Sequence, residues 1–70
     1  MNICAPFAGI VHYQVQPGQA VDTGDVLAIV EAVKLEAPVY SPGPGTATTF
    51  QHPDFADVSG GDLLLIVEEH

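Results

Sequence analysis

The fold of this chain is decided by one stretch near its middle, residues 26–40, which reads VLAIVEAVKLEAPVY. Two strand-sized runs, 26–32 and 35–40, leave only Val33 and Lys34 between them. The pattern therefore predicts two strands joined by a tight turn that holds Lys34. Two-residue hairpin turns usually take pairs such as Asn-Gly, because both central residues need positive φ. A β-branched Val33 is expected to be strained in such a turn.

Gly and Pro interrupt the rest of the chain every eight to twelve residues, and the segments between them are rich in Val, Ile, Leu and Thr. This spacing favours an all-β sandwich or barrel, and no helix-length amphipathic pattern interrupts it. Besides the two central strands, we expect strands near 2–5, 10–15, 46–50 and 63–68, with short ones around Val21 and Val58.

The chain also resembles itself. At an offset of 36, the first half matches the second at these pairs: Ala5-Pro6 and Ser41-Pro42, Gly9 and Gly45, Pro17 and Pro53. At an offset of 37, the pairs are Val21 and Val58, Gly24-Asp25-Val26-Leu27 and Gly61-Asp62-Leu63-Leu64, and Ile29-Val30-Glu31 and Ile66-Val67-Glu68. Two copies are too few for a solenoid, which needs about three stacked repeats. We therefore expect two halves packed face to face about a pseudo-twofold axis, which makes a flattened β-sandwich.

Length and charge limit the function. The 70 residues suffice for one domain, so we treat 1–70 as a single unit with little room for a deep catalytic cleft. The formal net charge of -8 disfavours nucleic acid and anionic membrane surfaces as partners. The longest apolar runs are far shorter than the roughly 20 residues of a membrane helix, and no signal peptide is recognisable, so we expect a cytoplasmic protein.

Other polar residues give weak signals. The single cysteine, Cys4, lies between apolar neighbours and is expected to be a buried structural thiol. His12, His52 and His70 have no metal-ligand spacing, so no metal site is predicted. No catalytic triad pattern or phosphate-binding loop is recognisable, and no catalytic residue is assigned.

Lys34 is the only Lys or Arg of the chain. An enzyme that acylates a side-chain amine would therefore have one possible target. The alternative is an ordinary solvated lysine that pairs with Glu31 or Glu36, an interaction worth at most about 1 kcal/mol when exposed. Residue chemistry alone leaves both interpretations open.

The segment around Lys34 resembles a known attachment motif. It reads Glu31-Ala32-Val33-Lys34-Leu35-Glu36, and the biotin carboxyl carrier branch of the biotinyl/lipoyl attachment domain family typically has Glu-Ala-Met-Lys-Met followed closely by Glu. The resemblance extends over essentially the whole chain, through Ala5-Pro6, Gly9, Pro17-Gly18, Gly24-Asp25, Ser41-Pro42-Gly43 and Gly61-Asp62.

The resemblance implies two antiparallel four-stranded sheets with quasi-twofold symmetry, and a non-catalytic carrier with biotin attached covalently to Lys34. Glu31, Ala32, Val33, Leu35 and Glu36 would then be the recognition residues. The implied partners are a biotin protein ligase, which loads the lysine, and the biotin carboxylase and carboxyltransferase of a biotin-dependent carboxylase, for which an acyl-CoA substrate is expected.

Two departures leave other cargoes open, because Val33 and Leu35 replace the two methionines of the typical motif. The lipoyl branch commonly has Asp before the lysine, which this chain lacks, but glycine-cleavage carriers resemble it in having Glu-Ser-Val-Lys-Ala. A lipoyl carrier and an unmodified interaction module of the same fold are therefore the alternatives to a biotin carrier.

Overall fold

A computed structural model describes residues 1–69 of the chain, and His70 lies outside the described residues. Eight strands make up its regular structure: β1 (Asn2–Cys4), β2 (Gly9–Tyr13), β3 (Ala20–Val21), β4 (Val26–Ala32), β5 (Leu35–Tyr40), β6 (Gly45–Thr48), β7 (Asp57–Val58) and β8 (Leu63–Glu68). No helix in this part of the chain could cross a membrane.

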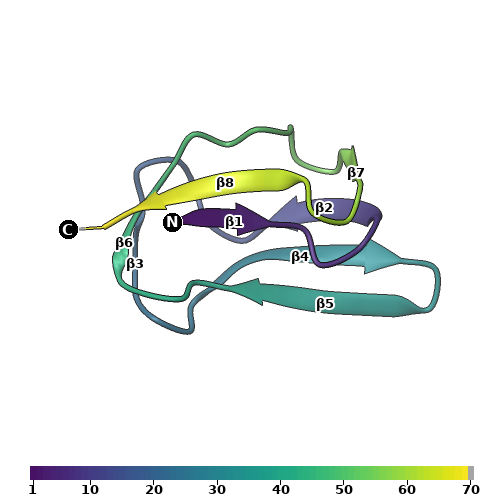
Figure 1. Cartoon of the computed structure of the whole chain (residues 1–70), viewed down its shortest axis with the longest axis horizontal. Helices are drawn as coiled ribbons and strands as arrows, with labels where there is room; N and C mark the ends of the chain where they lie inside the picture. The colour runs from purple at the N-terminus through teal and green to yellow at the C-terminus, as the bar shows by residue number, and fades with distance from the viewer. Residues whose placement is uncertain (70) are drawn as a thin grey trace.

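The strands form two antiparallel four-stranded sheets, in the orders β1-β8-β6-β3 and β5-β4-β2-β7 (Figure 1). Each strand has a counterpart in the other half of the chain: β1 and β5, β2 and β6, β3 and β7, β4 and β8. Exchanging these counterparts converts the order of one sheet into the order of the other. The predicted flattened sandwich with quasi-twofold symmetry is confirmed. Each sheet takes two strands from each half, so the halves interleave and neither half forms a sheet by itself.

The bounds of three strands match the sequence-based prediction. The predicted ranges 26–32, 35–40 and 63–68 are the observed β4, β5 and β8. β2 and β6 end earlier than predicted, at Tyr13 and Thr48. After β6 the chain turns because Thr49 takes a φ of 48°, in the left-handed region that extended strands do not use.

The core lies between the sheets and repeats the symmetry of the chain. Its fully buried side chains include the equivalent pairs Val11 and Ala47, Leu27 and Leu64, Ala28 and Leu65, and Val30 and Val67. β4 and β8 are the inner strands that supply most of them. Ser41 is the one buried polar residue of the described chain, and its hydroxyl donates a hydrogen bond to the carbonyl of Gly43 at 2.7 Å.

Two equivalent turns tie the halves together. The Asp25 and Asp62 carboxylates each accept a hydrogen bond at 2.8 Å from the backbone N–H three residues earlier. Within these turns, Gly24 and Gly61 have φ of 87° and 88°. The Gly24 N–H donates to the carbonyl of Ser41, and the Gly61 N–H donates to the carbonyl of Ala5, both at 2.8 Å. Each turn is therefore fixed to the other half of the chain.

Gly9 and Gly45 permit close approaches between neighbouring strands. A Cβ at Gly9 would lie 2.5 Å from the carbonyl oxygen of Glu31, and one at Gly45 would overlap the carbonyl oxygen of Glu68. Both obstacles are backbone atoms, which cannot rotate away. The repeated glycine is thus required where β2 passes β4 and where β6 passes β8.

Cys4 differs from the sequence-based expectation of a buried thiol, because its side chain is exposed. Alternate residues of a strand face opposite sides, and in β1 Ile3 is the residue that faces the core. Asn2 and Cys4 therefore face away from the core, and both are exposed. The prediction was wrong because apolar neighbours do not determine which residue of a short strand points inward.

A Gly45→Ala substitution should lower the free energy of unfolding by at least about 2 kcal/mol, because the new methyl group would force β6 away from β8. The matched control is Gly43→Ala, whose Cβ would meet only the Met1 side chain at 3.5 Å. Urea unfolding of both variants measures the difference. Equal stabilities would show that the strand approach at Gly45 is not tight.

Candidate functional site

Lys34 lies at the tip of the β4–β5 hairpin. Ala32 pairs with Leu35, so the connection consists of Val33 and Lys34 alone. The molecule measures 36 × 20 × 17 Å, and the hairpin lies at one end of its long axis, away from the start of β1 and the end of β8 (Figure 1). A partner could therefore hold the tip without meeting either of those strand ends.

The backbone strain of this turn falls on Lys34. Its φ is 68°, whereas Val33 is absent from the residues with positive φ. Positive φ at the second central residue alone is the pattern of a type II turn, which usually has Gly or Asn there. The expectation of strain at Val33 was therefore wrong, because the turn does not adopt the type I′ geometry that needs positive φ twice.

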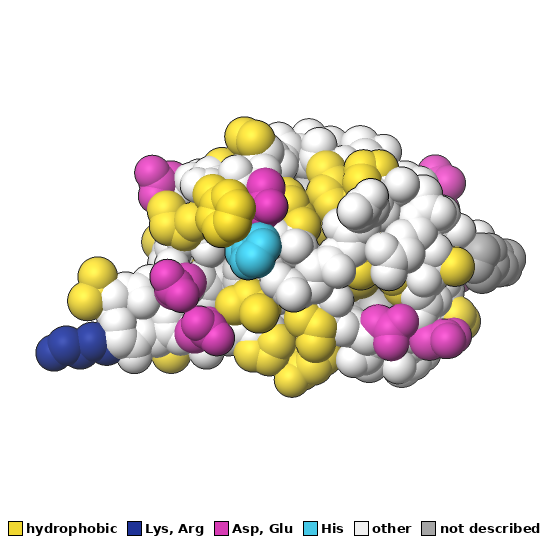
Figure 2. All heavy atoms as spheres, turned by 180° about the vertical axis from the view of Figure 1, so that it is seen from behind, with side chains coloured by type: hydrophobic (Ala, Val, Ile, Leu, Met, Phe, Trp, Pro, Cys, Tyr) yellow, Lys and Arg dark blue, Asp and Glu magenta, His cyan; other side chains and the backbone are white. Residues whose placement is uncertain are grey.

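The side chains of the tip project into solvent. Val33 is 90% exposed and Leu35 is 54% exposed, although both are large and apolar. Within residues 1–69, no carboxylate lies within 4.0 Å of the Lys34 amine. The ion pair with Glu31 or Glu36, which was the alternative interpretation of this lysine, is not formed. In Figure 2 the lysine side chain, in dark blue, projects beyond the rest of the surface.

Glu31 and Glu36 face each other directly across β4 and β5, and both are exposed. Like charges that lie opposite each other in a sheet are unfavourable. The tip thus combines three features that do not stabilise the folded state: a lysine with positive φ, two exposed aliphatic side chains and a like-charged pair. All the residues predicted from the motif are brought together here.

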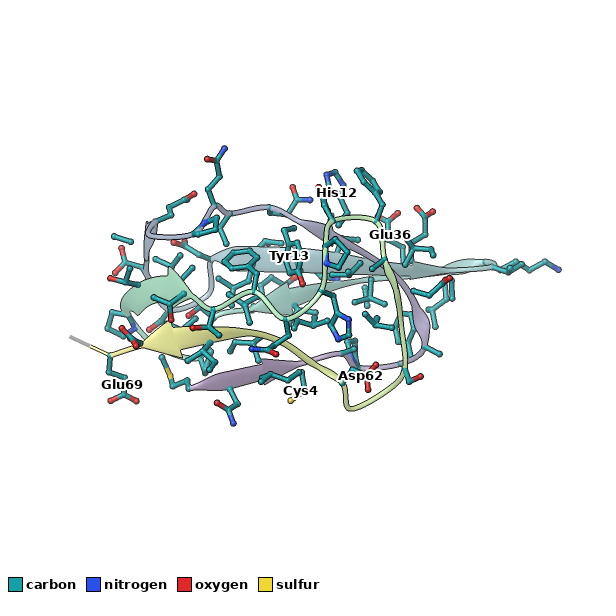
Figure 3. All side chains as sticks on the ribbon, turned by 90° about the horizontal axis from the view of Figure 1, so that it is seen from above. Cys4, His12, Tyr13, Glu36, Asp62 and Glu69 are labelled. Atoms are coloured by element: carbon teal, nitrogen blue, oxygen red, sulfur yellow. The ribbon has the colours of Figure 1, made fainter. Side chains whose placement is uncertain are left out.

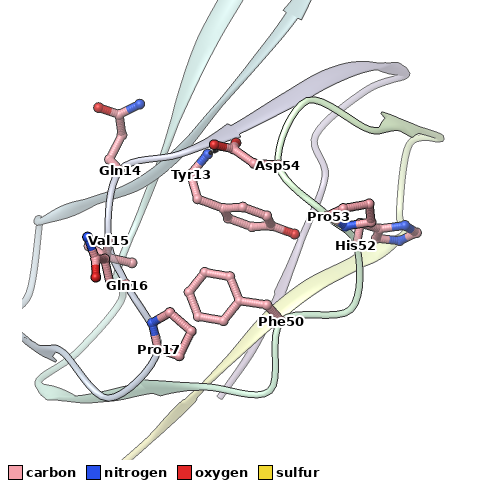
Figure 4. A pocket seen from close by; sticks show the side chains of 9 residues that line it. All are labelled: Tyr13, Gln14, Val15, Gln16, Pro17, Phe50, His52, Pro53 and Asp54. Atoms are coloured by element: carbon pink, nitrogen blue, oxygen red, sulfur yellow. Dashed lines mark hydrogen bonds between the residues drawn. The ribbon is translucent and has the colours of Figure 1, made fainter.

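A separate hollow of about 440 Å³ lies between the ends of β2 and β6 (Figure 4). Tyr13 and Phe50 meet edge to face in it, with ring centroids 4.7 Å apart. The Tyr13 hydroxyl donates a hydrogen bond to the carbonyl of Leu64 at 3.2 Å, and burial raises the pKa of this phenol. Lys34 does not line this hollow, so the hollow is separate from the projecting tip.

Two further residues stand out that the sequence did not single out. Phe55 is 64% exposed and has a φ of 65°, and its ring stacks on the ring of His12. The signal was present in the repeat, because an offset of 37 places Phe55 opposite Gly18. The sequence comparison matched Pro17 with Pro53 at an offset of 36, and at that offset Phe55 does not align with Gly18.

Among residues 1–69, no three His, Cys, Asp or Glu side chains are grouped as metal ligands would be.

The geometry defines a class of protein: a symmetric β-sandwich that presents one lysine on a two-residue hairpin. The sequence model of the family described as biotin-requiring enzyme matches residues 1–67. This chain therefore belongs to the biotinyl/lipoyl attachment domain family.

Solved structures share this fold. A single-chain, multi-domain long-chain acyl-CoA carboxylase matches with a TM-score of 0.91 and 23% identity, over 100% of this chain and 7% of that chain. The urea carboxylase of Kluyveromyces lactis matches with a TM-score of 0.86 and 25% identity, over 97% and 6%. An aspartoacylase family protein from Mesorhizobium loti matches with a TM-score of 0.85 and 16% identity, over 94% and 22%. This chain thus spans less than a quarter of each of these proteins.

The positive φ of Lys34 predicts an unusual ranking of substitutions. Lys34→Asn should leave the free energy of unfolding within about 0.5 kcal/mol of the wild type, because Asn tolerates this region, whereas Lys34→Val should lower it by about 1–2 kcal/mol. Urea unfolding of the two variants measures this. Equal stability of both would contradict the turn geometry.

Proposed function

We propose that this chain is a biotin carboxyl carrier whose biotin is attached to the Nζ of Lys34. The observation that supports it best is the position of Lys34: the only side-chain amine of the chain lies on an exposed tip, without a carboxylate partner among residues 1–69. Membership of the biotin-requiring enzyme family supports the same role.

The tip fits covalent attachment. An amide bond needs an amine that a second protein can reach, and the two-residue loop leaves Lys34 accessible on several sides. In the loading step, the Lys34 amine attacks the acyl carbon of biotinyl-adenylate, the amide bond forms, and AMP leaves. The amine proton passes to a base in the ligase. Val33 and Leu35 offer the ligase apolar contacts beside the amine.

The domain then acts as a mobile attachment point for a biotin-dependent carboxylase, with an acyl-CoA as the proposed substrate class. Bound biotin supplies a ureido nitrogen that takes up and releases carboxylate. The protein contributes a rigid hairpin, held by β4 within a four-stranded sheet. Since the tip does not need to be ordered at each encounter, docking with the biotin carboxylase and carboxyltransferase loses less conformational entropy. Tethering also makes each delivery effectively intramolecular.

Coexpression with a biotin protein ligase should add the mass of one biotin to the wild-type chain and none to Lys34→Arg, which keeps the positive charge but has no primary amine. Intact-mass spectrometry of both proteins measures this. Coexpression with a lipoate ligase is the parallel control. A wild-type chain without a biotin adduct would refute the proposal, and a lipoyl adduct in its place would support a lipoyl carrier.

The like-charged pair supports a recognition role for Glu31 and Glu36. In a double Glu31→Gln, Glu36→Gln variant, the rate of biotin loading should fall about tenfold, since charge-assisted contacts to the ligase would be lost. The fold should be retained. Glu68→Gln is the matched control, because Glu68 is the counterpart of Glu31 at the other end of the sandwich and should load at the wild-type rate. If the double variant also loads at that rate, the two carboxylates serve only solubility.

A further inference from the structure

Phe55 has a left-handed backbone conformation, and the equivalent position in the other half of the chain is a glycine, Gly18. The turns 16–19 and 53–56 are equivalent: in each, the last N–H donates to the first carbonyl, at 3.0 and 3.2 Å. In each, the third residue also donates its N–H across to the neighbouring strand, Gly18 to Ala47 and Phe55 to Val11, both at 2.7 Å. The φ values are 88° for Gly18 and 65° for Phe55.

The fold does not account for a phenylalanine here. A bulky residue with positive φ is strained, by an amount of order 1–3 kcal/mol. Gly18 meets the same requirement without strain, so the first turn is an internal control for the second. Burial does not offset the strain, because Phe55 is 64% exposed. The side chain therefore serves something other than the core.

Phe55 instead stacks on His12 at the surface of the molecule. The two rings stack with centroids 4.6 Å apart and an interplanar angle of 27°. The Nε2 of His12 lies 4.0 Å from Oδ2 of Asp54, and both side chains are about half exposed. The resulting platform lies on the outer face of β2, on the side of the molecule that also carries Glu36 and opposite Cys4 (Figure 3).

Carboxylates surround this platform. Asp54 borders it directly, and Asp57 and Glu31 both pair with Ile10, two residues from His12. All three carboxylate residues are exposed. Figure 2 shows carboxylate and hydrophobic side chains side by side on one face, with the single lysine projecting from one end. An exposed aromatic ring bordered by carboxylates matches one chemical group in particular, the planar guanidinium of arginine, which stacks on rings and pairs with carboxylates.

We propose that the surface formed by His12, Asp54, Phe55 and Asp57, here the His12–Phe55 platform, docks an arginine-bearing segment of a partner protein. The net charge of -8 repels phosphate backbones and anionic lipids, so a protein is the partner that fits. A second copy of this chain does not fit, because Lys34 is its only Lys or Arg and it contains no arginine.

The test is an amide chemical-shift titration of the ¹⁵N-labelled Lys34→Ala chain at pH 7.5 and low salt. The probe is the peptide acetyl-Gly-Arg-Leu-Arg-Gly-amide, compared with analogues that replace both arginines by lysine or by the neutral isostere citrulline. Shifts should cluster at His12 and residues 54–57. Stacking predicts that the arginine peptide binds at least about threefold more tightly than the lysine peptide, and that the citrulline peptide is weakest.

Two variants separate the platform from the rest of the face. Phe55→Gly should weaken arginine-peptide binding at least about fivefold while keeping or raising the melting temperature, because glycine relieves the positive φ. Tyr40→Ala, which removes another exposed aromatic residue, should bind within about twofold of the parent chain.

Any of four results would overturn the proposal: equal binding of the arginine and lysine peptides, unchanged binding by Phe55→Gly, shifts centred elsewhere, or concentration-dependent shifts without peptide, which would indicate self-association. The Lys34→Ala background makes the test independent of cofactor loading. A failure of Lys34 to accept biotin would therefore leave this result interpretable, and the reverse also holds.

Discussion

The close approach of Gly9 to Glu31, repeated by Gly45 and Glu68, is the constraint on which the rest of this structure depends. At both places a backbone passes over a carbonyl group with no room for a side chain. The first contact lies three residues before Lys34, at the base of the hairpin. It holds β4 against β2, so the tip extends from a fixed support and not from a loose loop.

Interleaving of the two halves extends this rigidity through the whole sandwich. Each half supplies two strands to each sheet, and each Gly-Asp turn is bonded to the residue that directly follows β1 or β5 in the other half. Neither half can therefore loosen without breaking hydrogen bonds in both sheets. A domain of this size buries only a modest core, so hydrogen bonds between the two halves add to the stability that the core supplies. The outcome is a stable support for an exposed side chain.

Much of this could be predicted from the sequence, because the predictable parts repeat. Apolar runs predicted β4 and β8, the segment after the Lys34 turn predicted β5, and the duplicated Gly-Asp pattern indicated the symmetry. The failures occurred where backbone conformation, and not composition, decides the outcome. Cys4 was expected inside because its neighbours are apolar, but in β1 only Ile3 faces the core. Strain was expected at Val33, but the positive φ of the turn falls on Lys34. Phe55 escaped notice because its left-handed φ leaves no mark in hydropathy.

The internal repeat also separates features that the fold requires from features that it only tolerates. Gly9 and Gly45 agree between the halves, as do the turns of Asp25 and Asp62, so those residues serve the common architecture. Phe55 and Gly18 disagree at equivalent positions with equivalent hydrogen bonds, so the aromatic side chain serves something specific to its half. Lys34 also has positive φ, at a position where glycine or asparagine is usual. A residue that is strained where its counterpart is relaxed is best explained by what it contacts outside the chain. Phe55 and Lys34 thus share two features, a positive φ and an exposed side chain.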